Sequence, residues 1–187
     1  MTIAFLPVAA VVFVALNSAA FAQDDSSLTA EQLAAKFMAQ EATRGLVIAP
    51  ADGTTTATAD GATTLPADTT YASVDPNSQV NFQIKFAFDS AALAADEMSK
   101  LSTLCEVIKA SDIPTFKIIG HTDSSGTDSY NQNLSLLRAE EVKRNLVENC
   151  GVPDAKLVAT GVGEAFPLDA KDPKADVNRR VEFQVGS

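Results

Sequence analysis

The sequence predicts an α/β fold: a two-layer sandwich in which a mixed four-stranded sheet carries its helices on one face. Two kinds of segment support this prediction. In some, apolar and polar residues alternate as in half-buried strands; in others, apolar residues recur every three to five positions as in amphipathic helices. These segments follow one another in the order β-α-β-α-β-β within residues 80–187. Because strands covered on both faces are apolar throughout, we expect the second face of the sheet to be exposed to solvent.

The first strand is predicted at 81–88, where aromatic and aliphatic side chains fill one face. Asp89 and Ser90 follow and supply the cap of a helix predicted over 91–110. The strand face consists of Phe82, Ile84, Phe86 and Phe88, and the apolar positions of the helix are Leu93, Met98, Leu101, Leu104, Cys105 and Ile108.

A second strand is predicted at 115–119, and a polar loop connects it to a second helix at 130–149. Gly151 and Pro153 follow this helix, as is typical of a helix C-terminus. Two further strands are predicted at 156–162 and 181–185. The buried stripe of the second helix is expected to consist of Ser135, Ala139, Val142 and Leu146.

The first 22 residues carry no charged side chain and end in Ala20-Phe21-Ala22, the small-x-small pattern that precedes signal-peptidase cleavage. We interpret residues 1–22 as a secretory signal peptide, with an uncleaved membrane anchor as the alternative because the segment approaches the ~20 residues that span a bilayer. Either interpretation places the rest of the chain outside the cytoplasm.

Residues 23–79 are predicted to form a short helix over 30–41 followed by a linker. Thr29 and Gln32 have the spacing of a capping box. Ala, Thr, Asp and Gly dominate residues 51–70, and such a composition buries too little apolar surface to offset its ordering entropy.

The chain is acidic, with a net charge of −10 and an isoelectric point near 4.4. This charge argues against nucleic acid as a partner and against electrostatic binding to anionic lipid. With one His and two Cys in 187 residues, we expect neither a metal site nor a cofactor.

Cys105 and Cys150 each lie near the end of a predicted helix. Successive right-handed crossovers make the two helices parallel on one face of the sheet, so these ends are neighbours. In an exported protein we therefore expect a disulfide, with two buried thiols as the alternative.

The loop and helix start at 120–131 hold the residues with the clearest potential for binding. Asp123 lies in the loop, and Asn131 and Arg138 share one side of the following helix. A carboxylate and a guanidinium that face one groove suit a ligand with both an ammonium and a carboxylate group. From spacing alone, an internal ion pair between Asp123 and Arg138 explains the same residues.

The helix carries the pattern Asn131-x-x-Leu134-Ser135-x-x-Arg138-Ala139-x-x-Val142-x-x-x-Leu146, which resembles the peptidoglycan-association motif of the OmpA C-terminal-like domain family. That family includes Pal lipoproteins and the periplasmic part of MotB. Three further blocks over about 80–186 are similar to the family in the same order. They are Phe86-Ala87-Phe88-Asp89-Ser90, Gly120-His121-Thr122-Asp123 and Asn178-Arg179-Arg180-Val181-Glu182.

The resemblance implies non-covalent binding of peptidoglycan through the diaminopimelate of its stem peptide, in the periplasm of a Gram-negative cell and at its wall or outer membrane. It places Asp123 and Arg138 on the free amine and carboxylate of diaminopimelate. Further groove residues implied by the resemblance are Thr122, Asn131, Leu134, Asp89 and Ser90, with Arg180 as a candidate for a second anionic group.

We expect no enzymatic activity. His121, Asp123 and Ser135 are the residue types of a hydrolase triad, but His121 and Asp123 alternate along an extended segment and should point in opposite directions. Two other functions remain as alternatives: an envelope subunit that recruits another protein through its acidic N-terminal half, and a wall tether anchored in the inner membrane.

Overall fold

The computed structural model describes residues 24–43, 71–86 and 90–186. The predicted signal peptide at 1–22, the linker predicted at 51–70, and Phe88 and Asp89 lie outside the described residues. None of the described helices is long and apolar enough to cross a membrane.

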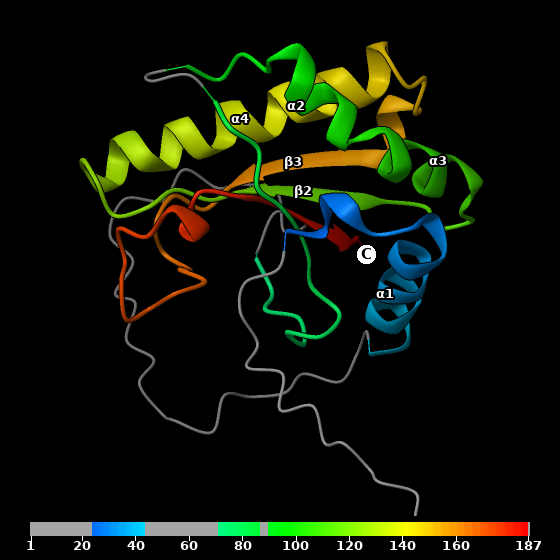
Figure 1. Cartoon of the computed structure of the whole chain (residues 1–187), viewed down its shortest axis with the longest axis horizontal. Helices are drawn as coiled ribbons and strands as arrows, with labels where there is room; N and C mark the ends of the chain where they lie inside the picture. Colours follow the sequence, from blue (N-terminus) through cyan, green and yellow to red (C-terminus); the bar gives the residue numbers. More distant parts are fainter. Residues whose placement is uncertain (1–23, 44–70, 87–89, 187) are drawn as a thin grey trace, which may run out of the picture.

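The four strands form one mixed sheet, which confirms the predicted α/β architecture (Figure 1). Its strands are β1 (Val80–Phe82), β2 (Phe116–Gly120), β3 (Leu157–Gly161) and β4 (Val181–Val185), in the order β1-β4-β2-β3. β2 and β3 are parallel, and β4 is antiparallel to both of its neighbours. The register pairs Gly120 with Val181, so the residues that follow β2 lie beside those that precede β4.

Helices α2 (Ala95–Lys100), α3 (Ser102–Ala110) and α4 (Asp128–Glu148) lie on one side of the sheet. The single helix predicted over 91–110 is therefore wrong: there are two short helices, and the first begins four residues late. Leu93 forms a β-bridge with Phe86, which keeps the chain before α2 extended. Ser90 does not cap a helix, because its hydroxyl accepts a hydrogen bond from the nearby N–H of Ala92 (3.0 Å) and α2 begins after Ala94.

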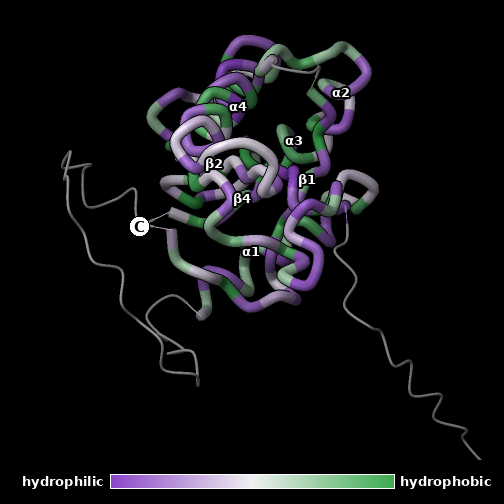
Figure 2. The backbone as a smooth tube through the Cα atoms, turned by 90° about the vertical axis from the view of Figure 1, so that its left-hand side faces the viewer, coloured by the Kyte–Doolittle hydropathy of each residue, from purple (hydrophilic) through white to green (hydrophobic). Residues whose placement is uncertain are grey.

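Helix α4 packs closely on β2 and β3. The predicted stripe of Ser135, Ala139, Val142 and Leu146 is buried, and Asn131 and Asn145 extend it. A Cβ atom added at Gly120 or Gly161 would overlap the backbone of Ser135 or Leu136, so glycine at both positions permits this approach. Figure 2 shows hydrophobic and hydrophilic segments together along α4, as expected for a helix with one buried face.

The second face of the sheet is covered over β1 and β4, so the predicted solvent-exposed face is wrong there, whereas Lys117 of β2 and the middle of β3 are partly exposed. All five residues of β4 are buried, including Glu182 and Gln184. The segment that begins at Tyr71 crosses this face: the Tyr71 hydroxyl donates to Glu182 Oε2 (3.3 Å), and Gln184 Nε2 donates to the carbonyl of Ala72 (2.9 Å). The ring of Phe166 packs on Tyr71 with centroids 4.2 Å apart. The alternating polar residues bond to this covering layer instead of to water.

Helix α1 (Ala30–Thr43) belongs to the same hydrophobic core. Leu33 and Phe37 are buried, and the Phe37 ring meets Phe116 edge-on with centroids 5.1 Å apart. The helix covers the stretch predicted at 30–41. A capping box lies at its start: the N–H of Thr29 donates to the side-chain oxygen of Gln32 (2.9 Å), and the N–H of Gln32 donates to the Thr29 hydroxyl (3.3 Å).

The side chain of Gln40 fastens α1 to the edge of β4. Its Oε1 accepts from the N–H of Val185 (2.8 Å), and its Nε2 donates to the carbonyls of Ser78 (2.8 Å) and Phe183 (3.3 Å). These backbone groups lie just beyond the start of β1, whose ladder pairs Val80 with Phe183. Gln40 therefore supplies hydrogen bonds where the neighbouring strand is absent.

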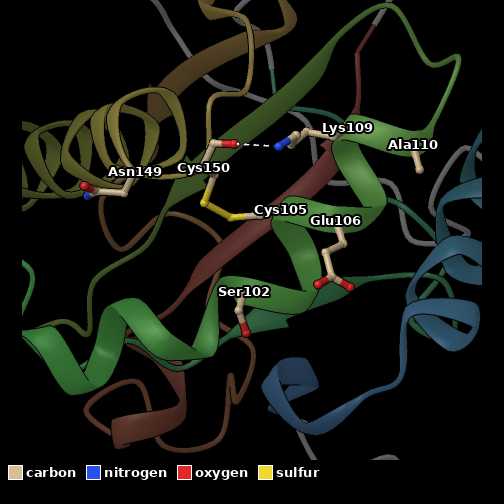
Figure 3. A pocket seen from close by; sticks show the side chains of 7 residues that line it. All are labelled: Ser102, Cys105, Glu106, Lys109, Ala110, Asn149 and Cys150. Atoms are coloured by element: carbon tan, nitrogen blue, oxygen red, sulfur yellow. Dashed lines mark hydrogen bonds between the residues drawn. A yellow bond between two sulfur atoms is a disulfide. The ribbon is translucent and has the colours of Figure 1, made fainter.

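The predicted disulfide is present between Cys105 of α3 and Cys150, which follows α4. The two Cα atoms are 5.9 Å apart. Figure 3 shows the bond beside Lys109, whose Nζ donates to the carbonyl of Cys150 (3.0 Å). The ends of the two helices are thus joined both covalently and by a hydrogen bond.

Candidate functional site

The candidate site is the loop between β2 and α4. Thr127 caps α4 by accepting from the N–H of Tyr130 (3.3 Å). Two hydrogen bonds to the chain after β3 fix the loop backbone. The N–H of Thr122 donates to the carbonyl of Gly163 (2.9 Å), and the N–H of Ser124 donates to the carbonyl of Pro173 (3.0 Å). These bonds hold Asp123 at the start of α4.

Asp123 forms an ion pair with Arg179, with 2.6 Å between Oδ2 and Nη1. Its other carboxylate oxygen accepts from the N–H of Ser125 (2.8 Å). Burial acts to raise the pKa of Asp123 and is the largest single influence, but the hydrogen bonds from Arg179 and Ser125 together lower the pKa below its usual value. Asp123 is therefore ionised at neutral pH.

Arg138 and Asp123, both described by the structure, do not form an ion pair with each other. Its guanidinium lies over the ring of Phe86, with Cζ 4.8 Å from the centroid. Its Nε is buried and has no hydrogen-bond partner among the described residues. Burial lowers the pKa of Arg138, and the nearby positive charge of Arg179 acts in the same direction, while the charges of Tyr130 and Asp123 oppose the shift. The internal ion pair that spacing left open is therefore not formed.

The other groove residues differ in their surroundings. Asn131 is buried, and its Nδ2 donates to the carbonyl of Asp123 (3.2 Å) and to Glu164. Thr122 is also buried, and its hydroxyl has no partner among the described residues. Leu134 and Ser90 are partly exposed. The contact of Phe86 with Arg138 brings Phe86 beside α4.

Comparison with known families identifies this arrangement. The family model described as "OmpA family" matches residues 85–180, which is just over half of the chain. The chain belongs to the OmpA family. This confirms the family resemblance of the motif on α4.

Relatives of the chain are found among outer-membrane proteins. Outer membrane porin F of Pseudomonas fluorescens is 36% identical over 109 residues, a match that covers 57% of this chain and 33% of the porin. The outer-membrane lipoprotein YfiB of Pseudomonas aeruginosa is 32% identical over 105 residues, covering 55% of this chain and 62% of the lipoprotein. The chain thus spans about a third of the porin. These relatives agree with the predicted location in the cell envelope.

A solved structure with a similar domain is the peptidoglycan-associated lipoprotein from Burkholderia pseudomallei. It is 30% identical, with a TM-score of 0.47, over 56% of this chain and 88% of the lipoprotein. The OmpA family match includes the loop and α4 but leaves out α1, β1 and β4. This one helix and these two strands nevertheless belong to the same hydrophobic core.

In this member of the OmpA family, Arg180 is not placed to bind a second anionic group. Its side chain is 2% exposed, and its Nε and Nη2 donate to Asn81 (3.0 Å) and to the carbonyl of Phe166 (3.3 Å). Arg180 faces the covered side of the sheet, as Glu182 does. Its neighbour Arg179 is the one that reaches the loop, and the antiparallel register of β2 and β4 is the signal that could have identified it.

The possible hydrolase triad is not assembled. His121 Nε2 lies 3.1 Å from Glu182 Oε2 on the covered face of the sheet. The Ser135 hydroxyl donates to the carbonyl of Gln132 (2.8 Å) and accepts from the N–H of Gly163 (2.9 Å). His121 and Ser135 therefore serve the packing around the loop.

Proposed function

We propose that this OmpA-family protein binds peptidoglycan non-covalently, through the diaminopimelate of the stem peptide. Arg138 holds the carboxylate at the far end of diaminopimelate, and Asp123 holds the ammonium of the same carbon. The observation that carries the proposal is that these two opposite charges flank one loop without neutralising each other: Asp123 pairs with Arg179, and the Nε of Arg138 is buried without a partner among the described residues.

Unused hydrogen-bonding capacity supports this assignment. An ionised carboxylate offers about four lone-pair sites, and the two described bonds to Asp123 leave room for an ammonium group. The buried donor of Arg138 and the buried hydroxyl of Thr122 both lack partners among the described residues. A buried polar group without a partner is costly, so a ligand that supplies one gains affinity.

The stack of Arg138 on Phe86 fixes the guanidinium before a ligand arrives. A fixed guanidinium loses less conformational entropy on binding and presents its paired donors to a carboxylate. Each charged hydrogen bond contributes about 1.5–3 kcal/mol. Two such contacts with modest packing predict a single-site Kd on the order of micromolar to millimolar. Stable retention then depends on the many repeats of the polymer.

Sedimentation with purified sacculi tests the proposal. Asp123→Ala and Arg138→Ala should abolish co-sedimentation, while circular dichroism shows that the fold is retained. Arg144→Ala is the matched control, because Arg144 lies on the same helix and pairs only with Glu141 and Glu148 among the described residues. If the Asp123 and Arg138 variants pellet as the parent chain does, the proposed site is wrong.

The choice of diaminopimelate has a separate test. A lysine-containing muropeptide has the terminal amine but lacks the adjacent carboxylate, so it leaves Arg138 without a partner. NMR titration should show binding of the diaminopimelate muropeptide that is at least about tenfold tighter, the effect of one charged hydrogen bond. Equal affinities would contradict the role of Arg138.

A further inference from the structure

A second candidate binding surface lies at the other end of the sheet. A groove of about 650 Å³ runs between α1 and α3 and along the residues that follow α3. Its apolar lining includes Phe37, Met38, Val107 and Ile113. Three of these side chains are buried in the core, but Met38 is 67% exposed. A flexible, exposed Met beside a groove is suited to contact with an apolar side chain of a partner.

Carboxylates line the same groove. They are Glu31 and Glu41 of α1, Glu106 of α3 and Asp112. Lys and Arg are absent from the described lining of this groove. The lysines of α1 and α3 are engaged with other groups: Lys36 pairs with Asp25 (2.8 Å), and Lys109 bonds to the carbonyl of Cys150 (Figure 3). Lys156 reaches its edge by donating to the carbonyl of Ser111 (2.9 Å), so one described cation stands against four carboxylates. The groove therefore combines an apolar floor with an excess of negative charge among its described residues.

We propose that this groove, which we call the α1–α3 groove, binds a basic amphipathic segment of another cell-envelope protein. Large apolar side chains of the segment contact Met38 and the floor, and its Lys or Arg side chains reach the carboxylates. Charge complementarity selects this occupant. A second copy of the chain, with a net charge of −10, would bring further negative charge to an acidic groove.

The position of the groove allows both interactions at once. Ile113 precedes the start of β2, whereas Asp123 follows the end of the same strand. Figure 1 shows α1 and α3 at one end of the sheet and the loop before α4 at the opposite end. A partner in the α1–α3 groove thus leaves the proposed peptidoglycan site open, and the protein can connect that partner to the wall.

NMR titration tests the proposal with a defined probe, a 14-residue amphipathic helical peptide of Leu and Lys. The peptide is added to the purified, ¹⁵N-labelled protein in its exported form. Amide shifts should then concentrate at residues 30–41 and 106–113. The same peptide with Glu in place of Lys should not bind. Shifts spread evenly over the acidic surface would overturn the proposal.

Charge-matched variants separate the groove from the general acidity of the chain. Changing Glu31, Glu41 and Glu106 together to Gln should weaken peptide binding about tenfold, because three exposed ion pairs contribute roughly 0.5 kcal/mol each. The control removes the same charge elsewhere, with Asp96→Asn, Glu140→Gln and Glu148→Gln on other helices, and should change the Kd less than about twofold. Equal weakening by both sets would show that only net charge matters.

The apolar part of the proposal has its own pair of variants. Met38→Ala should weaken binding of the Leu-Lys peptide, whereas Leu137→Ala, at a residue 44% exposed on α4, should not. Light scattering without peptide provides the last control. A dimer that is lost in the Met38 variant would assign the groove to a second copy and overturn the proposed partner. Sacculus sedimentation should be unchanged in all groove variants, which separates this result from the peptidoglycan test.

Discussion

Arg179 holds the carboxylate of Asp123 at a distance of 2.6 Å and leaves the guanidinium of Arg138 outside the ion pair. The site thus contains two arginines with different tasks. Arg179 orients the carboxylate and favours its ionised form, and in the proposed site Arg138 provides the positive charge for a ligand. This division follows from the strand register, which places the residues before β4 beside those after β2.

Replacing Arg179 should shift the acid limit of wall binding. The pKa of Asp123 lies below its usual value, with burial opposing the shift and Arg179 and Ser125 producing it. In Arg179→Gln the pKa of Asp123 should rise, so the carboxylate becomes protonated, and sacculus binding is lost, at a higher pH than in the parent chain. Carboxyl ¹³C titration and sedimentation across pH 3–7 measure the two effects. An unchanged pKa of Asp123 would contradict the assigned role of Arg179, and Arg144→Gln serves as the control.

Removing the amide of Gln40 should destabilise the chain. In Gln40→Ala the buried N–H of Val185 and the carbonyls of Ser78 and Phe183 lose their side-chain partner. We expect the free energy of unfolding to fall by about 1–3 kcal/mol, as is usual for unsatisfied buried groups. Urea denaturation measures the change. Met38→Ala on the same helix, at an exposed position, should cost less than about 0.5 kcal/mol.

Reduction of the disulfide should lower stability without disassembling the site. The bond closes a loop with a sequence separation of 45 residues. In the chain-entropy model a loop of this length contributes about 4 kcal/mol. Chemical denaturation with and without reductant measures the difference in the free energy of unfolding. The double variant Cys105→Ala, Cys150→Ala should be as stable as the reduced chain, and reductant should not change its stability. Equal denaturation midpoints for the oxidised and reduced protein would show that the disulfide does not stabilise the fold.

His121 should make stability depend on pH below neutrality. Burial is the largest influence and lowers the pKa of the imidazole, although the hydrogen bond to Glu182 acts to raise it. A histidine with a lowered folded-state pKa stabilises the fold fully above its ordinary pKa of about 6.5, and this contribution is lost as the pH falls through the folded-state pKa. Because His121 is the only His in the sequence, the difference in stability between the parent chain and a His121 variant from pH 7 to 5 isolates its contribution from that of the carboxylates. His121→Gln should flatten this dependence, and an equally steep slope in the variant would refute the interpretation.

Periodicity was sufficient to predict the four-stranded sheet, α4 and its buried stripe, but not the extent of the first strand: β1 is Val80–Phe82, whereas a strand was predicted at 81–88. The right-handedness of β-α-β crossover connections was sufficient to predict that Cys105 lies beside Cys150. Both are local or chirality-based arguments that do not require the identity of distant partners. The family motif likewise lies within one helix and its preceding loop, so it can be recognised without a structure.

The failures concern contacts between segments far apart in sequence. The polar residues Glu182 and Gln184 read as a solvent-exposed face, but they bond to a covering segment that begins at Tyr71. The late start of α2 results from the bridge of Leu93 to Phe86, which keeps the chain before Ala95 extended. Arg179 and Arg180 differ by one position, and only the register of β4 decides which of them reaches Asp123.

The attachment of α1 to β4 through Gln40 has a mechanical consequence. Suppose that peptidoglycan holds the loop after β2 while tension acts on the part of the chain before Asp24. The pulling force then passes first through the hydrogen bonds that Asp24 and Asp25 accept from the backbone of Gln83 and Asn81. The contacts of Leu33, Phe37 and Gln40 carry what remains into the sheet. The strength of such a proposed link between wall and envelope is then set by how firmly residues 24–43 are docked on the sheet.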